Sequence, residues 1–301
     1  MSGQADSLKS ILYALGANLA IALAKLFGAV FTGSSAMLAE AIHSFADSGN
    51  QGLLLLGLKR AKRPPSTDYP LGYGKAIYFW SFIVALILFS MGGLFSIYEG
   101  MHKWETPELL TMPWVAVGIL VFSIVAESIS LAGCLREVNK VRGHRSLWRW
   151  FRDSRQSELI VVLGEDIAAL FGLVLALGAV LLAIATGDPG FDALGSIAIG
   201  VLLVLIAIGI GVEVKGLLIG QSVEPEVKCA IYDLLASREE VEKVLNLITL
   251  QLGNDVMVAV KAKMNEFATP AEMVTAINRC EVAIKEALPQ IKWVFFEPDV
   301  A

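Results

Sequence analysis

Six long apolar stretches restrict this sequence to folds that span a membrane. Each is about 20 residues or longer, the length that an α-helix needs to cross the hydrocarbon core of a bilayer. Hydrophobic residues make up 55% of the 301 residues and charged residues only 18%, a composition far from that of a soluble protein. The sequence therefore predicts six transmembrane helices, over residues 11–31, 36–58, 77–98, 114–135, 159–186 and 194–219.

The last part of the chain, residues 222–301, has shorter apolar runs and charged residues every few positions. The triplet Gly253-Asn254-Asp255 separates two stretches rich in β-branched residues, which is typical of a hairpin. Thr269 and Pro270 are a typical helix start. These patterns predict, in chain order, a helix over 227–236, strands over 244–252 and 256–264, a helix over 270–288 and a strand over 292–297.

The short loops predict the orientation of the spans, because lysine and arginine gather on the cytoplasmic side. The loops after spans two and four are rich in lysine and arginine, whereas the loops on the opposite side contain a single basic residue of this kind, Lys103. Both termini are therefore predicted to be cytoplasmic. The predicted fold class is an α-helical membrane protein with six transmembrane helices (1–221) and a C-terminal cytoplasmic α+β domain (222–301) of ferredoxin-like α-β-β-α-β order.

Charge and cysteine content exclude some classes of partner and site. Residues 222–301 hold 13 acidic and 8 basic side chains, so nucleic acid is not an expected partner. Cys134, Cys229 and Cys280 show no CxxC spacing, which argues against a disulfide framework or a cysteine zinc site. The first apolar run is too long for the core of a signal peptide and is interpreted as a true span.

The second predicted span carries polar side chains on one face. Glu40, His43, Asp47 and Asn50 follow one another at spacings of three, four and three residues. A helix turns about 100° per residue, so these spacings place all four in one narrow sector. Ionisable groups at membrane depth are costly and usually face a protein interior or a water-filled ion pathway. This face is therefore the first candidate for a functional site.

Other spans add polar groups at membrane depth. Glu165 and Asp166 are adjacent in span five and lie about 100° apart around a helix, so Asp166 is preferred as the group that points at a shared partner. Glu127 in span four is either a proton relay or an acid neutralised by a neighbouring helix. Asn18 in span one is either a hydrogen-bonding partner between helices or a ligand.

A histidine and an aspartate four residues apart can place a nitrogen and an oxygen on one metal ion. His43 and Asp47 have this spacing, and Asp166 supplies a further acid from another helix. At membrane depth both groups need partners, which a divalent cation provides. The sequence therefore predicts a metal site between spans two and five.

At this point the sequence resembles the cation diffusion facilitator family of divalent-metal transporters. The resemblance covers almost the whole chain, and the motif in the second span together with the following loop is its specific part. The matching stretches are residues 34–48, the loop 69–75, the start of span six at 191–196 and the closing segment 295–298.

The resemblance implies a homodimer in the lipid bilayer, each subunit of which exports a divalent cation, most often Zn²⁺, from the cytoplasm in exchange for protons. Family ligands come in pairs four residues apart on spans two and five. His43 and Asp47 match the first pair and Asp166 matches one member of the second. The other member falls at Val162, which cannot bind metal, so Glu165 or water is expected to complete the site.

Two further departures from the family concern accessory metal sites. Tyr69 and Tyr73 stand in the loop where the family often has histidine, and residues 222–301 contain no histidine. The tail is therefore expected to dimerise without a metal cluster. Glu40, Asn50 and Asn18 are expected either to support the metal ligands through hydrogen bonds or to line the ion pathway.

The sequence thus favours a proton-coupled zinc exporter, with no enzymatic activity and no resident cofactor, as a multi-pass protein of the cell (inner) membrane. Binding would displace protons from His43 and the acids, and His43 would take up a proton again after release. An oxygen-rich site with Glu165 would instead favour Mn²⁺ or Fe²⁺. A non-transporting, metal-responsive partner subunit and an intramembrane hydrolase remain as alternatives, although the hydrolase lacks an HExxH motif.

Overall fold

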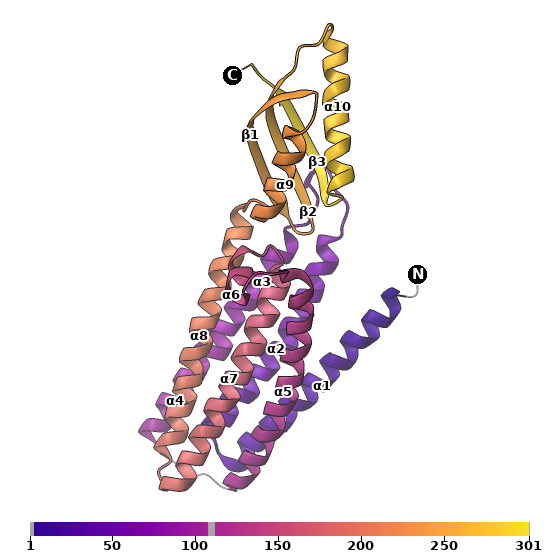
Figure 1. Cartoon of the computed structure of the whole chain (residues 1–301). Coiled ribbons are helices and arrows are strands. Elements are labelled where there is room, and N and C mark those ends of the chain that lie inside the picture. Colours follow the sequence, from indigo (N-terminus) through magenta and orange to yellow (C-terminus); the bar gives the residue numbers. More distant parts are fainter. Residues whose placement is uncertain (1–2, 108–111, 301) are drawn as a thin grey trace. The chain divides into compact units, whose positions relative to one another are not determined.

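The computed structural model describes residues 3–107 and 112–300, with side chains from residue 18 onward (Figure 1). Long helices make up the first two thirds of the described chain, and each contains one of the predicted spans. The third long helix is continuous but consists of three consecutive parts. The short helix α6 lies in a loop. The bounds are α1 Gly3–Thr32, α2 Ser35–Ala61, α3 Ala76–Ile87, the π-helix η1 Leu88–Leu94, α4 Phe95–Glu105, α5 Pro113–Arg142, α6 Leu147–Asp153, α7 Ser157–Thr186 and α8 Gly190–Ile219.

Four of these helices are long and apolar enough to cross a membrane among the residues that the structure describes: Ala76–Glu105, Pro113–Arg142, Ser157–Thr186 and Gly190–Ile219. Residues Asn18–Thr32 of α1 form a shorter apolar helix. Helix α2 is continuous, but its row of polar side chains interrupts its apolar sequence and lowers its mean hydropathy. The multi-pass membrane architecture is confirmed, while the count of six spans stays a prediction.

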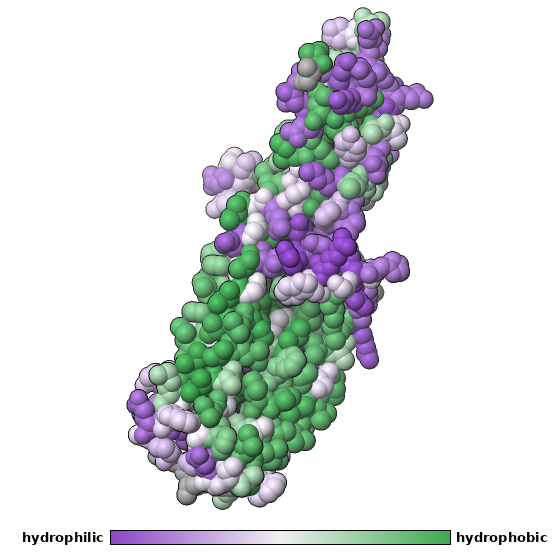
Figure 2. Space-filling model, turned by 60° about the vertical axis from the view of Figure 1, so that its left-hand side comes forward, coloured by the Kyte–Doolittle hydropathy of each residue, from purple (hydrophilic) through white to green (hydrophobic). Residues whose placement is uncertain are grey.

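The outer surface of the long helices is hydrophobic, as the green region of Figure 2 shows. Large apolar side chains on several helices are strongly exposed, among them Phe27, Phe122, Ile129 and Leu205. A soluble monomer rarely exposes so extended an apolar surface. Lipid chains are the environment that such a surface requires, since an α-helix pairs the backbone polar groups of its interior within itself.

Small residues allow helix α8 to approach η1 and α4 closely. A Cβ atom at Gly200 would lie 2.7 Å from the carbonyl oxygen of Gly93 and 2.7 Å from the amide nitrogen of Ile97. Glycine is therefore required where these backbones cross, as is common between membrane helices. Gly93 and Gly200 thus allow α8 to pack tightly against the third long helix.

The start of α2 is held by serine side chains. The hydroxyl oxygen of Ser34 accepts a hydrogen bond from the amide of Met37 at 3.2 Å and so caps the helix. The Asp192 carboxylate on α8 accepts from the amide of Ser35 at 2.7 Å and from its hydroxyl group at 3.0 Å. These bonds fix the end of α2 nearest to Glu40 against α8.

The C-terminal part has the predicted α-β-β-α-β order. Strands β1 and β2 pair antiparallel and β2 and β3 pair parallel, so the sheet order is β1-β2-β3. The first strand begins three residues before the predicted start, because its pairing continues past a bulge to Val241. The bounds are α9 Pro225–Ala236, β1 Val241–Leu252, β2 Asp255–Met264, α10 Pro270–Ala287 and β3 Ile291–Pro298.

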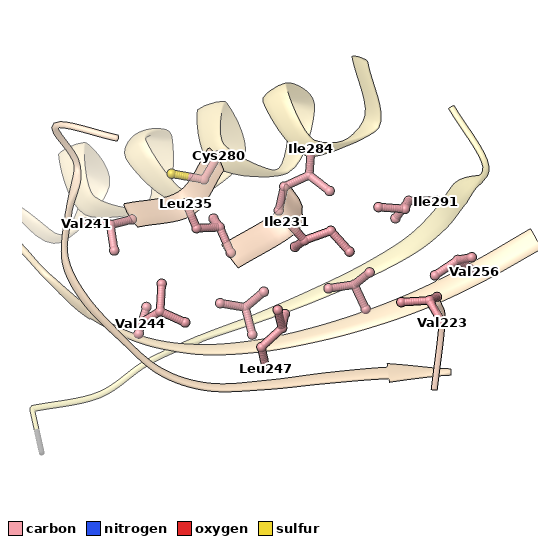
Figure 3. Packing of buried hydrophobic residues seen from close by; sticks show 13 residues of the cluster. Val223, Ile231, Leu235, Val241, Val244, Leu247, Val256, Cys280, Ile284 and Ile291 are labelled. Atoms are coloured by element: carbon pink, nitrogen blue, oxygen red, sulfur yellow. The ribbon is translucent and has the colours of Figure 1, made fainter. Parts of the chain in front are cut away.

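One face of this sheet packs against α9 and α10 (Figure 3). Alternate residues of β2 face this core, because Val256, Val258, Val260 and Ala262 are all buried. Ile231 and Leu235 from α9 and Cys280 and Ile284 from α10 complete the core. Cys280 is a free thiol, as are Cys134 and Cys229.

The chain divides into two compact units. The first comprises Met1–Leu56, Trp80–Arg145 and Glu158–Glu213, and the second Gly57–Phe79, Ser146–Ser157 and Val214–Ala301. The second unit thus contains the predicted domain 222–301 together with two loop segments. Within it, the Tyr78 hydroxyl oxygen accepts a hydrogen bond from the amide of Gly253 at 2.9 Å. The boundary at residue 221 stays a prediction.

Candidate metal centre

His43 and Asp47 lie one turn apart on α2, and the Nδ1 atom of His43 is 3.5 Å from an oxygen of Asp47. The His43 side chain is completely buried. Its ring lies beside η1, since a Cβ atom at Gly92 would be 3.8 Å from Nδ1. The π-helix therefore leaves room for this imidazole, which fits the frequent occurrence of π-helical turns near functional sites.

The two adjacent acids of α7 contact different helices, as their angular separation predicts. Asn50 on α2 donates a hydrogen bond from its amide nitrogen to Glu165 at 2.6 Å. Ser130 on α5 donates from its hydroxyl group to Asp166 at 3.5 Å. Glu165 and Asp166 thereby connect α7 to α2 on one side and to α5 on the other.

A small cavity of about 20 Å³ lies among α1, α2, α5 and α7. This volume is enough for about one water-sized particle, since one requires roughly 10–15 Å³. Three of the predicted site acids share the cavity, whereas His43 is not among its lining residues. The lining consists of Asn18, Ser44, Asp47, Gln51, Glu127, Val162, Glu165, Asp166 and Ala169.

Several buried polar atoms around this cavity have no hydrogen-bond partner among the described residues. A buried polar atom without a partner costs about 1–3 kcal/mol, so such atoms are rare in folded proteins. Both nitrogens of His43 and one oxygen each of Asp47 and Asp166 belong to this group. In a neutral imidazole one nitrogen carries a hydrogen and the other a lone pair, so a cation would satisfy one nitrogen of His43 and the two carboxylate oxygens. The full set is Glu40 Oε1, His43 Nδ1 and Nε2, Asp47 Oδ1, Asn50 Oδ1, Ser123 Oγ and Asp166 Oδ2.

The donors do not converge to a closed coordination sphere. Within the described part of the chain, no group of three or more His, Cys, Asp or Glu side chains is arranged so that it could hold a metal ion. Val162 forms an apolar part of the cavity wall, one helical turn before Asp166. Glu165 opens onto the same cavity and is the acid nearest in sequence to the unmatched position.

Lys25 was not among the predicted site residues, although it lies in the middle of the polar cluster. Its side chain on α1 is completely buried. The ammonium nitrogen donates a hydrogen bond to Ser44 at 2.6 Å and lies 3.4 Å from Glu40 and 4.0 Å from Glu127. A lysine within the predicted span 11–31 was the signal that could have revealed it. Its contact with Glu127 supports the interpretation of that acid as neutralised by a neighbouring helix.

The sequence matches the model of the cation efflux transmembrane domain over residues 11–219. The chain belongs to the cation efflux family. This confirms the resemblance to the cation diffusion facilitators. The matched region contains the whole polar cluster, including Lys25 and the cavity.

Among curated relatives, the chain is 33% identical over 231 residues to the mitochondrial proton-coupled zinc antiporter SLC30A9 of Xenopus laevis, covering 76% of this chain and 41% of the relative. It is 30% identical over 235 residues to metal tolerance protein C4 of Arabidopsis thaliana, with 75% and 50% covered. It is 24% identical over 270 residues to the cation-efflux pump FieF of Escherichia coli, with 89% and 84% covered.

The chain therefore spans less than half the length of the Xenopus relative, whose name places it in mitochondria. The membrane in which the present protein resides is thus not given by these relatives, and the cell (inner) membrane stays a prediction. The cytoplasmic position of the termini is likewise a prediction.

Proposed function

We propose that this protein moves a divalent metal cation across a membrane in exchange for protons, with Zn²⁺ as its preferred cargo. The observation that carries the proposal is the buried cavity between α2 and α7 that Asp47, Glu165 and Asp166 share. His43 lies one turn from Asp47, and neither of its nitrogens has a hydrogen-bond partner among the residues that the structure describes. A nitrogen and several carboxylate oxygens form a donor set that suits Zn²⁺.

Proton exchange follows from the chemistry of these donors. Histidine and carboxylates bind a metal only in their deprotonated forms, so binding releases protons. When the metal leaves, the same groups take protons up again. The names of two relatives, a proton-coupled zinc antiporter and a cation-efflux pump, support this direction and coupling. The protein is further proposed to act as a homodimer that exports the cation from the cytoplasm. Its C-terminal domains, residues 222–301, would pair without a metal cluster.

Glu165 takes the place of the ligand that Val162 cannot supply. Its carboxylate faces the cavity and is oriented by the hydrogen bond from Asn50. Such supporting partners typically change metal affinity by about 10- to 100-fold when they are removed. Asn50→Leu is therefore expected to weaken zinc binding within that range, as measured by titration of the purified protein.

The decisive experiment uses purified protein in liposomes with a pH gradient. Wild-type protein should accumulate Zn²⁺ only when the gradient is present, and Asp166→Asn should abolish this flux. Glu137→Gln is the matched control, because Glu137 is an exposed acid on α5. Flux that persists in Asp166→Asn, or that does not respond to the gradient, would refute the proposal. Competition by Mn²⁺ and Fe²⁺ tests the choice of metal.

A non-transporting partner subunit is the second candidate, and the apolar Val162 in the cavity wall favours it. In that case wild-type protein would bind zinc but show no flux in the same liposomes.

A further inference from the structure

Lys25 is the one lysine with a fully buried side chain in the part of the chain whose side chains the structure describes. Removing an ammonium group from water costs several kcal/mol unless acids and hydrogen bonds compensate it. Here the compensation comes from two helices, Glu40 and Ser44 on α2 and Glu127 on α5. Such an expensive arrangement at membrane depth is by default a functional candidate.

The partner Glu40 is enclosed on its other side by α7. A Cβ atom at Gly172 would lie 2.3 Å from Oε1 of Glu40, so this helix leaves space for the carboxylate only because residue 172 is glycine. That oxygen has no hydrogen bond to any described residue, while the other oxygen faces Lys25. Lys25 is thus the charge that compensates Glu40.

The ammonium group also lies directly beside the proposed metal cavity. Ser44 and Glu127 contact Lys25, and both line the cavity. A cation in the cavity therefore experiences a second, tethered cation behind a single layer of side chains. In a medium of low polarity, like charges at such short range repel each other strongly.

We propose that Lys25 is a built-in cation that positions Glu40 and Glu127 and weakens the hold of the cavity on its metal cargo. Glu40 is directed to the ammonium group and does not line the cavity, whereas Glu127 faces both the ammonium group and the cavity. Repulsion by the ammonium group then prevents the remaining acids from retaining the cargo, since transport requires that a bound ion can also leave. The inference rests on the proposed function, and Lys25 acts as a positioning residue without touching the metal.

The test is Lys25→Met in full-length protein, with zinc flux and zinc binding measured in parallel. Energetic coupling between two sites of a protein typically changes the affinity at one of them by roughly 5- to 150-fold. We expect KM and the Kd for zinc to fall about tenfold, within that range, and kcat to fall as well because release slows. Adding Glu40→Gln restores the charge balance and should return KM toward the wild-type value. Lys140→Met is the control, because it removes an exposed lysine that pairs with Glu137.

An unchanged KM and Kd in Lys25→Met would overturn the inference, as would a loss of flux that Glu40→Gln does not reverse, because both outcomes describe a lysine that only supports packing. If Lys25→Met does not fold, Glu40→Gln serves as the test. Its KM for zinc should rise, because the ammonium group of Lys25 loses a compensating acid and repels the cargo more strongly. An unchanged KM in Glu40→Gln would contradict the inference. Zinc binding separates the two proposals. Absent flux in wild-type protein refutes transport, while tighter binding in Lys25→Met still supports the role of Lys25.

Discussion

Removal of the Tyr78 hydroxyl group is expected to loosen the turn between β1 and β2. This hydroxyl group is buried, accepts a hydrogen bond from the amide of Gly253 at 2.9 Å and donates to its carbonyl oxygen at 3.4 Å. In Tyr78→Phe the carbonyl oxygen keeps the amide group of Gln251 as a donor at 2.6 Å, but the Gly253 amide loses its partner. The cost is therefore that of one unpaired buried N–H, about 1–2 kcal/mol.

Hydrogen–deuterium exchange of the full-length protein in nanodiscs measures this effect directly. A loss of about 1–2 kcal/mol corresponds to exchange roughly 5- to 30-fold faster at the turn. Tyr69→Phe is the matched control, because Tyr69 is an exposed tyrosine of the same unit. Equal exchange of the turn in both variants would refute the assignment of Tyr78 as the group that holds it.

Two further predictions concern other parts of the fold. Gly172→Ala should force the Glu40 carboxylate to move and destabilise the protein by about 1–3 kcal/mol. Gly178→Ala on the same helix is the control, because a Cβ atom there meets no neighbouring atom. Thermal unfolding should show a lower Tm for Gly172→Ala than for Gly178→Ala. Burial would raise the pKa of the Glu240 carboxyl, but hydrogen bonds from Arg238 lower it below its ordinary value. Stabilisation from Glu240 is therefore present above about pH 4.3 and lost as the pH falls through the lowered pKa. The rate at which 2,2′-dithiodipyridine labels the buried Cys280 thiol measures this loss, because the thiol must become exposed to react. Glu240→Gln should remove the rise of this rate at acid pH.

The C-terminal fold could be predicted from the sequence because its signals are local. Alternation in 256–264 identifies the buried face of β2, and the residues around Gly253 identify the hairpin. The side chain of Thr269 accepts from the amide of Glu272 at 3.3 Å and starts α10 where its N-cap signal predicts. Each of these features depends on neighbours a few residues apart, for which residue preferences are informative.

Helix ends near the membrane were less predictable. Hydropathy locates the segment that lies in hydrocarbon, whereas the backbone continues its hydrogen bonding beyond it. The third long helix therefore extends to Glu105 rather than to the predicted end at residue 98, and α5 extends to Arg142 rather than to residue 135. The seven residues of η1 gave no sequence signal apart from the pair Gly92 and Gly93.

The polar face of α2 shows where prediction from one helix ends. Helical spacing places Glu40 and Asn50 on the same face, but the structure gives them different partners, Lys25 on α1 and Glu165 on α7. Which partner each one meets depends on how the neighbouring helices are rotated, and no local pattern contains that information. Since a single helix thus contacts both Lys25 and the proposed metal cavity, a rotation or shift of α2 would change both at once. This shared position provides a physical route by which binding of cargo can be coupled to rearrangement of the ion pairs.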